Sequence, residues 1–156
     1  MRPNALSIGH EVLAITNSPE KQQDAKAMGA DDVLVVKDYV GKELTEIGGV
    51  DAMLSFSPSM KQNSQAIEGL RPGGRLVTTA VSAEPIQGDP IQMLFKQTSI
   101  VGSAHNNPAD LVDILGLTAV GKVKPQLEIY PLDEINRVLA RLAEGKVRHR
   151  AVLTHN

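Results

Sequence analysis

His10-Glu11-Val12-Leu13-Ala14-Ile15-Thr16 is the stretch that decides the fold, because its apolar centre is typical of a strand buried in a parallel sheet. Asn17-Ser18-Pro19-Glu20-Lys21 follows and is predicted to open a helix that runs to Gly29-Ala30. Val33-Leu34-Val35-Val36 is then a second apolar strand. Two strands that flank a helix in this way predict an α/β protein with a parallel sheet.

This strand–helix–strand passage corresponds to the second half of a mononucleotide-binding unit. The first half should be a strand, a G-x-G-x-x-G turn and a helix, and only the end of that helix fits into Met1–Gly9. No G-x-G-x-x-G occurs anywhere in the sequence. The segment that would hold a pyrophosphate is therefore expected to be missing.

The alternation of short apolar strands with helices continues and predicts a doubly wound sheet. Beyond Val36 the expected strands are Asp51–Ser55, Arg75–Thr79 and Thr98–Gly102, with helices over Met60–Leu70 and Ile91–Lys96. After Gly102 we expect the helix Pro108–Val120, the strand Gln126–Tyr130, the helix Asp133–Glu144 and the strand Arg150–Thr154. Because the pattern of strand and helix alternation changes after Gly102, we expect the chain to divide into residues 1–102 and 103–156.

Composition excludes several classes of function. Hydrophobic residues make up 42% of the 156 and charged residues 22%, as in ordinary globular proteins. A net charge of −2 and the small number of aromatic residues argue against nucleic-acid partners. The absence of cysteine rules out disulfides and thiolate zinc sites. Without an apolar run of membrane-spanning length or a signal peptide, we expect a cytoplasmic protein with no membrane partner.

Six motifs occur in a fixed order across the chain. They are Ala27–Asp31, Leu70–Val77, Ile100–Ser103, Gly121–Pro125, Tyr130–Asn136 and Gly145–Leu153. In these motifs the chain resembles the medium-chain dehydrogenase/reductases of the zinc-type alcohol dehydrogenase branch. The resemblance implies a Rossmann-like doubly wound parallel sheet that lacks its first strand and glycine-rich turn.

The resemblance also implies which parts of such an enzyme this chain would lack. The catalytic domain with its zinc ligands would be absent, and residues 103–156 would be the segment that returns to that domain in relatives. The family strand order 3-2-1-4-5-6 puts the lost strand at the centre of the sheet. Val12–Thr16 and Ala52–Ser55 would then pair directly, borrow a strand, or leave backbone groups unpaired.

One predicted cofactor site lies at the end of the first strand. Members of the family that prefer NAD carry an acidic residue at the position of Thr16. Thr16, Asn17 and Ser18 instead offer small hydrogen-bonding groups at a helix N-terminus, and Lys21 adds a positive charge. We therefore expect NADP as the cofactor. The alternative is that Ser18 only caps the helix and Lys21 is a solvated surface lysine.

Other candidate cofactor-binding residues follow the later strands, where open α/β sheets bind ligands. They are Ser55, Ser57, Thr79, Ala80, Val81, Ser103 and His105. The resemblance places the ribose and nicotinamide near these positions, and it matches Arg150 to an arginine that contacts the pyrophosphate. Ordinary turn chemistry is the alternative for the serines, and a solvated charge cluster is the alternative for Arg150.

The sequence predicts no catalytic residue and no metal site. The four histidines lack ligand spacing, and no serine-nucleophile signature is present. In complete relatives the reaction is hydride transfer between nicotinamide and an alcohol or aldehyde, and we expect this chain alone not to oxidise alcohols with zinc. The alternative function is a non-catalytic module that binds a partner or itself, and we expect a homodimer through the Thr98–Gly102 edge.

Overall fold

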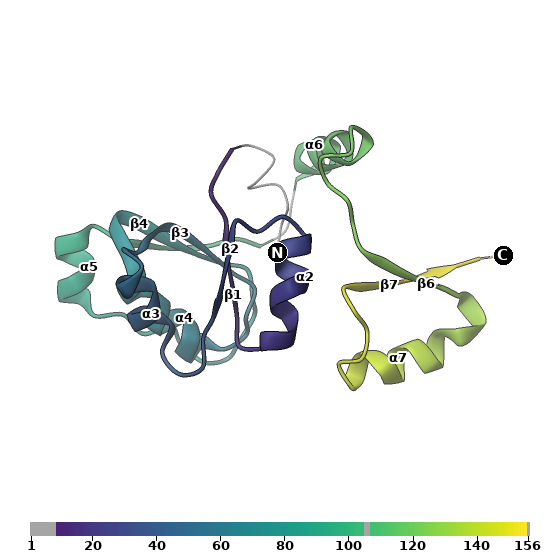
Figure 1. The fold of residues 1–156 in the computed structure, drawn as a ribbon, viewed down its shortest axis with the longest axis horizontal. Coiled ribbons are helices and arrows are strands. Elements are labelled where there is room, and N and C mark those ends of the chain that lie inside the picture. Colours follow the sequence, from purple (N-terminus) through teal and green to yellow (C-terminus); the bar gives the residue numbers. More distant parts are fainter. Residues whose placement is uncertain (1–8, 105–106, 156) are drawn as a thin grey trace. The chain divides into compact units, whose positions relative to one another are not determined.

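The computed structural model describes residues 9–104 and 107–155 (Figure 1). The chain divides into two compact units, one that ends at Leu111 and one that begins at Val112. The strands of the first unit are β1 (Leu13–Thr16), β2 (Asp32–Val35), β3 (Val50–Ser55), β4 (Leu70–Thr78) and β5 (Ser99–Gly102). Its helices are η1 (Pro19–Lys21), α2 (Gln22–Ala27), α3 (Val40–Glu46), α4 (Met60–Ala66), η2 (Ile67–Gly69) and α5 (Pro90–Lys96).

Every strand pairing described in this unit is parallel, which confirms the predicted α/β class. β1 pairs with β2, and β3, β4 and β5 form a separate three-stranded sheet in that order. No pairing joins β1 to β3 among the described residues. Of the three arrangements that the sequence left open at the centre of the sheet, direct pairing of these two strands is therefore not the one adopted.

Of the apolar clusters among the described residues, one has residues of both sheets packed against it. Val36, Val40, Leu44 and Ala66 are its buried members, and Leu13, Ile15, Leu34, Val50 and Met53 pack against them. Val40 and Leu44 belong to α3, a helix that the sequence analysis did not predict. Figure 1 shows α3 close to α4, and the backbones of the two helices meet at Gly41. A side chain at Gly41 would place its Cβ 2.1 Å from the carbonyl oxygen of Gln65.

The structure corrects three local predictions. The first strand begins at Leu13 rather than His10. The strand expected from Arg75 begins earlier, at Leu70, so that Arg71-Pro72-Gly73-Gly74 lie inside β4. Ser18 precedes the helical segment but does not cap it with its side chain, because its hydroxyl donates to the Glu20 carboxylate instead.

The second unit contains a parallel strand pair and one amphipathic helix. Its elements are β6 (Leu127–Pro131), η3 (Leu132–Glu134), α7 (Ile135–Ala143) and β7 (Arg150–Thr154), and they follow α6 (Pro108–Ala119). The Glu128 carboxylate on β6 accepts hydrogen bonds from the Tyr130 hydroxyl, the Arg148 backbone N–H and Arg141. The Tyr130 hydrogen bond is the main cause of the lowered pKa of Glu128. Among the described residues, no helix is both long and apolar enough to span a membrane.

Candidate functional site

The carboxyl ends of three strands are aligned at one edge of the β3–β5 sheet. Ser55, Thr78 and Gly102 are register partners at these ends. The backbone pairing continues one residue further, because Thr79 N–H donates to the Ser55 carbonyl at 3.1 Å and Ser103 N–H donates to the Thr78 carbonyl at 2.9 Å. The structure therefore brings three of the predicted residues, Ser55, Thr79 and Ser103, to one edge.

The side chain of Ser55 is occupied within the protein. Ser55 is 3% exposed, and its hydroxyl donates to Oδ1 of Asn63 on α4 at 2.5 Å. Asn63 is 1% exposed, and its Nδ2 also donates to the Ser57 carbonyl at 3.3 Å. Asn63 thus ties the turn after β3 to the following helix. The sequence analysis missed this residue, although a polar residue on the buried face of a helix is an unusual feature.

Ser57 and Thr79 also make local hydrogen bonds. The Ser57 hydroxyl accepts from the Ser59 N–H at 3.2 Å, which is the turn chemistry given above as the alternative for the serines. The Thr79 hydroxyl donates to the Ser55 carbonyl at 3.2 Å. Ala80 is half-buried, whereas Val81 is 92% exposed. The hydrogen bonds of Ser57 and Thr79 therefore stabilise the backbone just after the carboxyl ends of β3 and β4.

Thr78 is a second residue at this edge that the sequence analysis missed. Its hydroxyl oxygen is buried and has no hydrogen-bond partner among the described residues. A buried hydroxyl without a partner costs about 1–3 kcal/mol, so a ligand or water that bonded to it would lower the free energy of this edge. Thr78 was not predicted although its neighbour Thr79 was, because the sequence pattern does not reveal which of the two threonine side chains is buried.

The predicted cofactor site at the end of β1 has its own hydrogen-bond network. The Thr16 hydroxyl accepts from the Ser18 N–H at 3.1 Å, and the Ser18 hydroxyl donates to Glu20. This bond from Ser18 is the main cause of the lowered pKa of Glu20. Asn17 and Lys21 are exposed. An ionised carboxylate therefore lies in the segment where the sequence analysis considered only the positive charge of Lys21.

The remaining predicted residues are on other parts of the chain. Arg150 is an exposed residue of the second unit, where Leu127 on β6 is its register partner. His105 lies outside the described residues. No group of three or more histidine, aspartate or glutamate side chains that could hold a metal occurs within residues 9–104 and 107–155.

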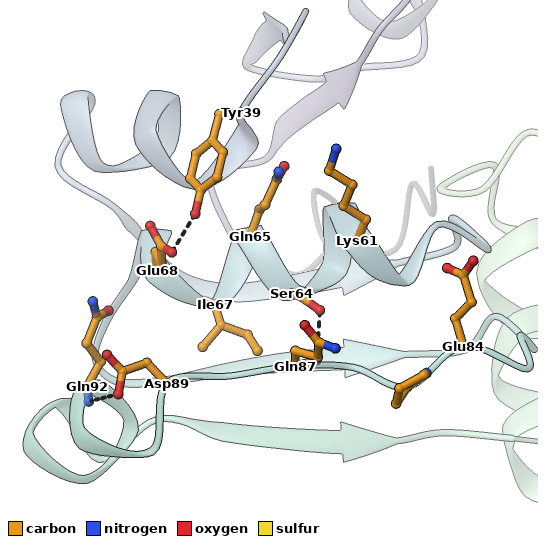
Figure 2. Close-up of a pocket in the computed structure, with 11 residues that line it drawn as sticks. Tyr39, Lys61, Ser64, Gln65, Ile67, Glu68, Glu84, Gln87, Asp89 and Gln92 are labelled. Atoms are coloured by element: carbon orange, nitrogen blue, oxygen red, sulfur yellow. Dashed lines mark hydrogen bonds between the residues drawn. The ribbon is translucent and has the colours of Figure 1, made fainter.

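A polar pocket of about 450 Å³ lies along α4 and the segment that leads into α5 (Figure 2). Its lining includes three carboxylates, Glu68, Glu84 and Asp89, against the single positive charge of Lys61. Figure 2 shows the Tyr39 hydroxyl directed at Glu68, and this hydrogen bond raises the pKa of Tyr39. None of the predicted cofactor-binding residues lines the pocket. Its negative charge makes it a poor site for phosphate groups.

Comparison with protein families gives one match that covers most of the chain. Residues 4–119 match the family described as zinc-binding dehydrogenase. Among individual sequences, the chain is 32% identical over 151 residues to an alcohol dehydrogenase from Geobacillus stearothermophilus. The aligned region is 96% of this chain but 44% of that enzyme, so the chain spans less than half of the length of this relative.

Solved structures agree with this match. The crystal structure of AibC covers 99% of this chain with a TM-score of 0.89 at 29% sequence identity, and the chain covers 48% of it. The alcohol dehydrogenase from Aeropyrum pernix covers 97% with a TM-score of 0.84 at 30% identity, and the chain covers 45% of it. The Rossmann-like fold predicted from the sequence is thereby confirmed.

Proposed function

The chain belongs to the zinc-binding dehydrogenase family, and from this premise we propose that it is the dinucleotide-binding part of an alcohol dehydrogenase-like oxidoreductase. The observation that carries the proposal is the aligned carboxyl edge of β3, β4 and β5. Ligands of open α/β sheets bind beyond the carboxyl ends of the strands. The unpartnered Thr78 hydroxyl at this edge is one group that a polar ligand would satisfy.

The proposed cofactor is NADP(H). One end of it would lie at the carboxyl end of β1 and the other at the carboxyl ends of β4 and β5. Thr16, Asn17, Ser18 and Lys21 would hold the phosphorylated ribose, and Ser103 with the Thr79–Val81 segment would face the nicotinamide end. The lack of a carboxylate at Thr16 and the charge of Lys21 support the phosphorylated cofactor. Glu20 opposes it, because an ionised carboxylate repels a phosphate. Without a glycine-rich turn to bind the pyrophosphate, the affinity should be weak.

Hydride transfer itself is proposed only for the complete enzyme. Bound NADP would supply the hydride acceptor or donor, and a metal in the catalytic part would polarise the alcohol oxygen. The residues of this chain would bind and orient the dinucleotide and exclude water from one of its sides. The chain by itself is proposed to be inactive as a dehydrogenase.

Charge reversal at Lys21, which follows the carboxyl end of β1, tests the preference for NADPH over NADH. We expect Lys21→Glu to weaken NADPH binding by about tenfold while NADH binding changes little, because only NADPH carries the additional phosphate. Glu20→Gln should act in the opposite direction by removing a repulsive charge. Nicotinamide fluorescence during titration of the purified chain gives both affinities. Equal affinity for the two cofactors in all three proteins would refute the preference.

A second candidate function, self-association, is supported by the outer strand. All four residues of β5 are exposed, and β4 is its only partner strand among the described residues. An exposed apolar edge strand is a template for pairing with another chain. We therefore propose a homodimer formed by β5 edges, in which Ile100 and Val101 lie at the interface.

Proline substitutions in β5 can test its outer edge and the edge paired with β4 one at a time. Because Ser103 N–H points to β4, the N–H groups of alternate residues do likewise, and the Ile100 N–H points outward. Ile100→Pro should thus convert the dimer to a monomer in analytical ultracentrifugation without loss of β4 pairing. Val101→Pro is the matched control, because it should disrupt β4 pairing and lower stability. A wild-type chain that sediments as a monomer at micromolar concentration would contradict the dimer.

A further inference from the structure

The polar pocket of about 450 Å³ is a hollow between two fixed walls of the first unit. One wall is α4 with η2, and the other is the segment of residues 84–89 that leads into α5. The Ser64 hydroxyl on α4 accepts a hydrogen bond from the Gln87 N–H at 2.8 Å, which holds the segment against the helix. Ile86 packs against the buried apolar cluster that includes Ile67. Contacts within the protein therefore keep both walls in place.

The negative charges of this pocket are not balanced by ion pairs in the described part of the chain. Three carboxylates line it with one cation, and none of the four, Glu68, Glu84, Asp89 and Lys61, is in an ion pair there. Glu68 accepts from Tyr39 through Oε1 only, and Asp89 accepts from two N–H groups of α5 through Oδ1 only. The second oxygen of each is thus open to a ligand that donates hydrogen bonds.

The carboxylates are spread along the pocket instead of meeting at one point. Figure 2 shows Glu68 and Asp89 towards one end and Glu84 at the other, with Ile67 and Ser64 between them. Glu84 and Asp89 are five positions apart on a segment without helix or strand, which can span up to about 17 Å. No group of three or more such side chains that could hold a metal ion occurs among the described residues. A compact cation would therefore meet one end only, whereas an elongated cation would meet both.

We propose that this pocket binds a linear aliphatic polyamine, with one terminal ammonium group at Glu84 and the other at Glu68 and Asp89. A primary ammonium group has three N–H donors and no acceptor, which matches the open carboxylate oxygens. The methylene groups between the two ends would contact the apolar side chains of Ile67 and Pro85. The site is separate from the proposed dinucleotide-binding edge, and amine binding to it requires no dinucleotide.

Titration calorimetry of the purified chain with spermidine tests the site, at about 0.15 M salt so that attraction between distant charges is screened. We expect saturable binding at a single site. Butylamine has one ammonium group and reaches one end of the pocket, so it should bind ~10-fold or more weakly. The neutral compound 1,8-octanediol, which is of similar length, should not bind. A spermidine titration that does not saturate, or equal affinity for butylamine, would overturn the proposal.

Three substitutions separate this site from general attraction of a polyamine to a negatively charged protein. Glu84→Gln removes the charge at one end of the pocket, so it should weaken spermidine binding by ~10-fold. Glu11→Gln is the matched control, because it removes the same charge from an exposed residue that does not line the pocket, and the affinity should stay unchanged. Lys61→Gln removes a like charge from the lining and should strengthen binding by ~3-fold or more.

The directions of these effects decide the outcome. Equal weakening by Glu84→Gln and Glu11→Gln would show that spermidine is attracted by net charge alone, which would overturn the proposal. Weaker binding to the Lys61→Gln variant would overturn it as well, because the lysine would then be a contact of the ligand and not a repelling charge.

Discussion

Gly41→Ala is expected to destabilise the first unit by about 3 kcal/mol or more, because the new Cβ has no room. The ideal Cβ position lies 2.1 Å from the Gln65 carbonyl oxygen and 3.1 Å from the Tyr39 ring. Relief would require α3 and α4 to separate, and both helices contribute buried residues to the same core. The higher helix propensity of alanine returns only about 1 kcal/mol. Urea denaturation followed by circular dichroism measures the loss.

Gly102→Ala is the matched control within the same unit. Nothing lies within 4 Å of a Cβ at Gly102. The free energy of unfolding of the Gly102→Ala variant should therefore differ from that of the wild type by less than about 1 kcal/mol. Wild-type stability in Gly41→Ala would show that the two helices do not meet as closely as described.

Asn63→Leu should cost about 3 kcal/mol, the second largest effect that we expect. The leucine has a similar volume, but the buried Ser55 hydroxyl loses its acceptor and the Ser57 carbonyl loses a donor. The turn after β3 is then held less firmly, and it forms part of the proposed cofactor-binding edge. Thermal unfolding of the purified variant gives the loss of stability.

A double-mutant cycle shows whether the Ser55–Asn63 hydrogen bond causes this effect. Ser55→Ala should cost about 1 kcal/mol in the wild type, but little or nothing in the Asn63→Leu background, where the hydroxyl is already unpaired. Additive losses would show that the two side chains act independently.

Most strands of the first unit could be predicted from sequence because they contain an apolar run bounded by turn residues, whereas the first half of β4, with Arg71-Pro72-Gly73-Gly74, has no such run. Val33–Val35 and Met53–Ser55 are of this kind, and both lie in strands. Helix α3 was missed because it is short and contains a glycine that sequence rules read as a helix breaker. Glycine is required at position 41 because the backbone of α3 contacts α4 there, and sequence rules do not predict such a tertiary contact.

The candidate site was predicted by position better than by side-chain role. Strand register brings Ser55, Thr79 and Ser103 to one edge, and the ends of apolar runs were enough to predict them. Hydrogen-bond partners could not be predicted in the same way. Ser55 bonds to Asn63, eight residues later, and Ser18 bonds to Glu20 instead of capping its helix. Competition between nearby acceptors decides such contacts, and it depends on exact backbone geometry.

The most direct test of the proposed function is to map NADPH binding by amide chemical shifts of the isotope-labelled chain. We predict saturable shifts at Thr16–Ser18, at Thr78–Val81 and at Ser103, with the pocket residues Ser64, Gln87 and Gln92 unaffected. Such a pattern would place the dinucleotide at the carboxyl ends of the strands. Shifts confined to the pocket, or no saturable shifts at millimolar NADPH, would contradict the account.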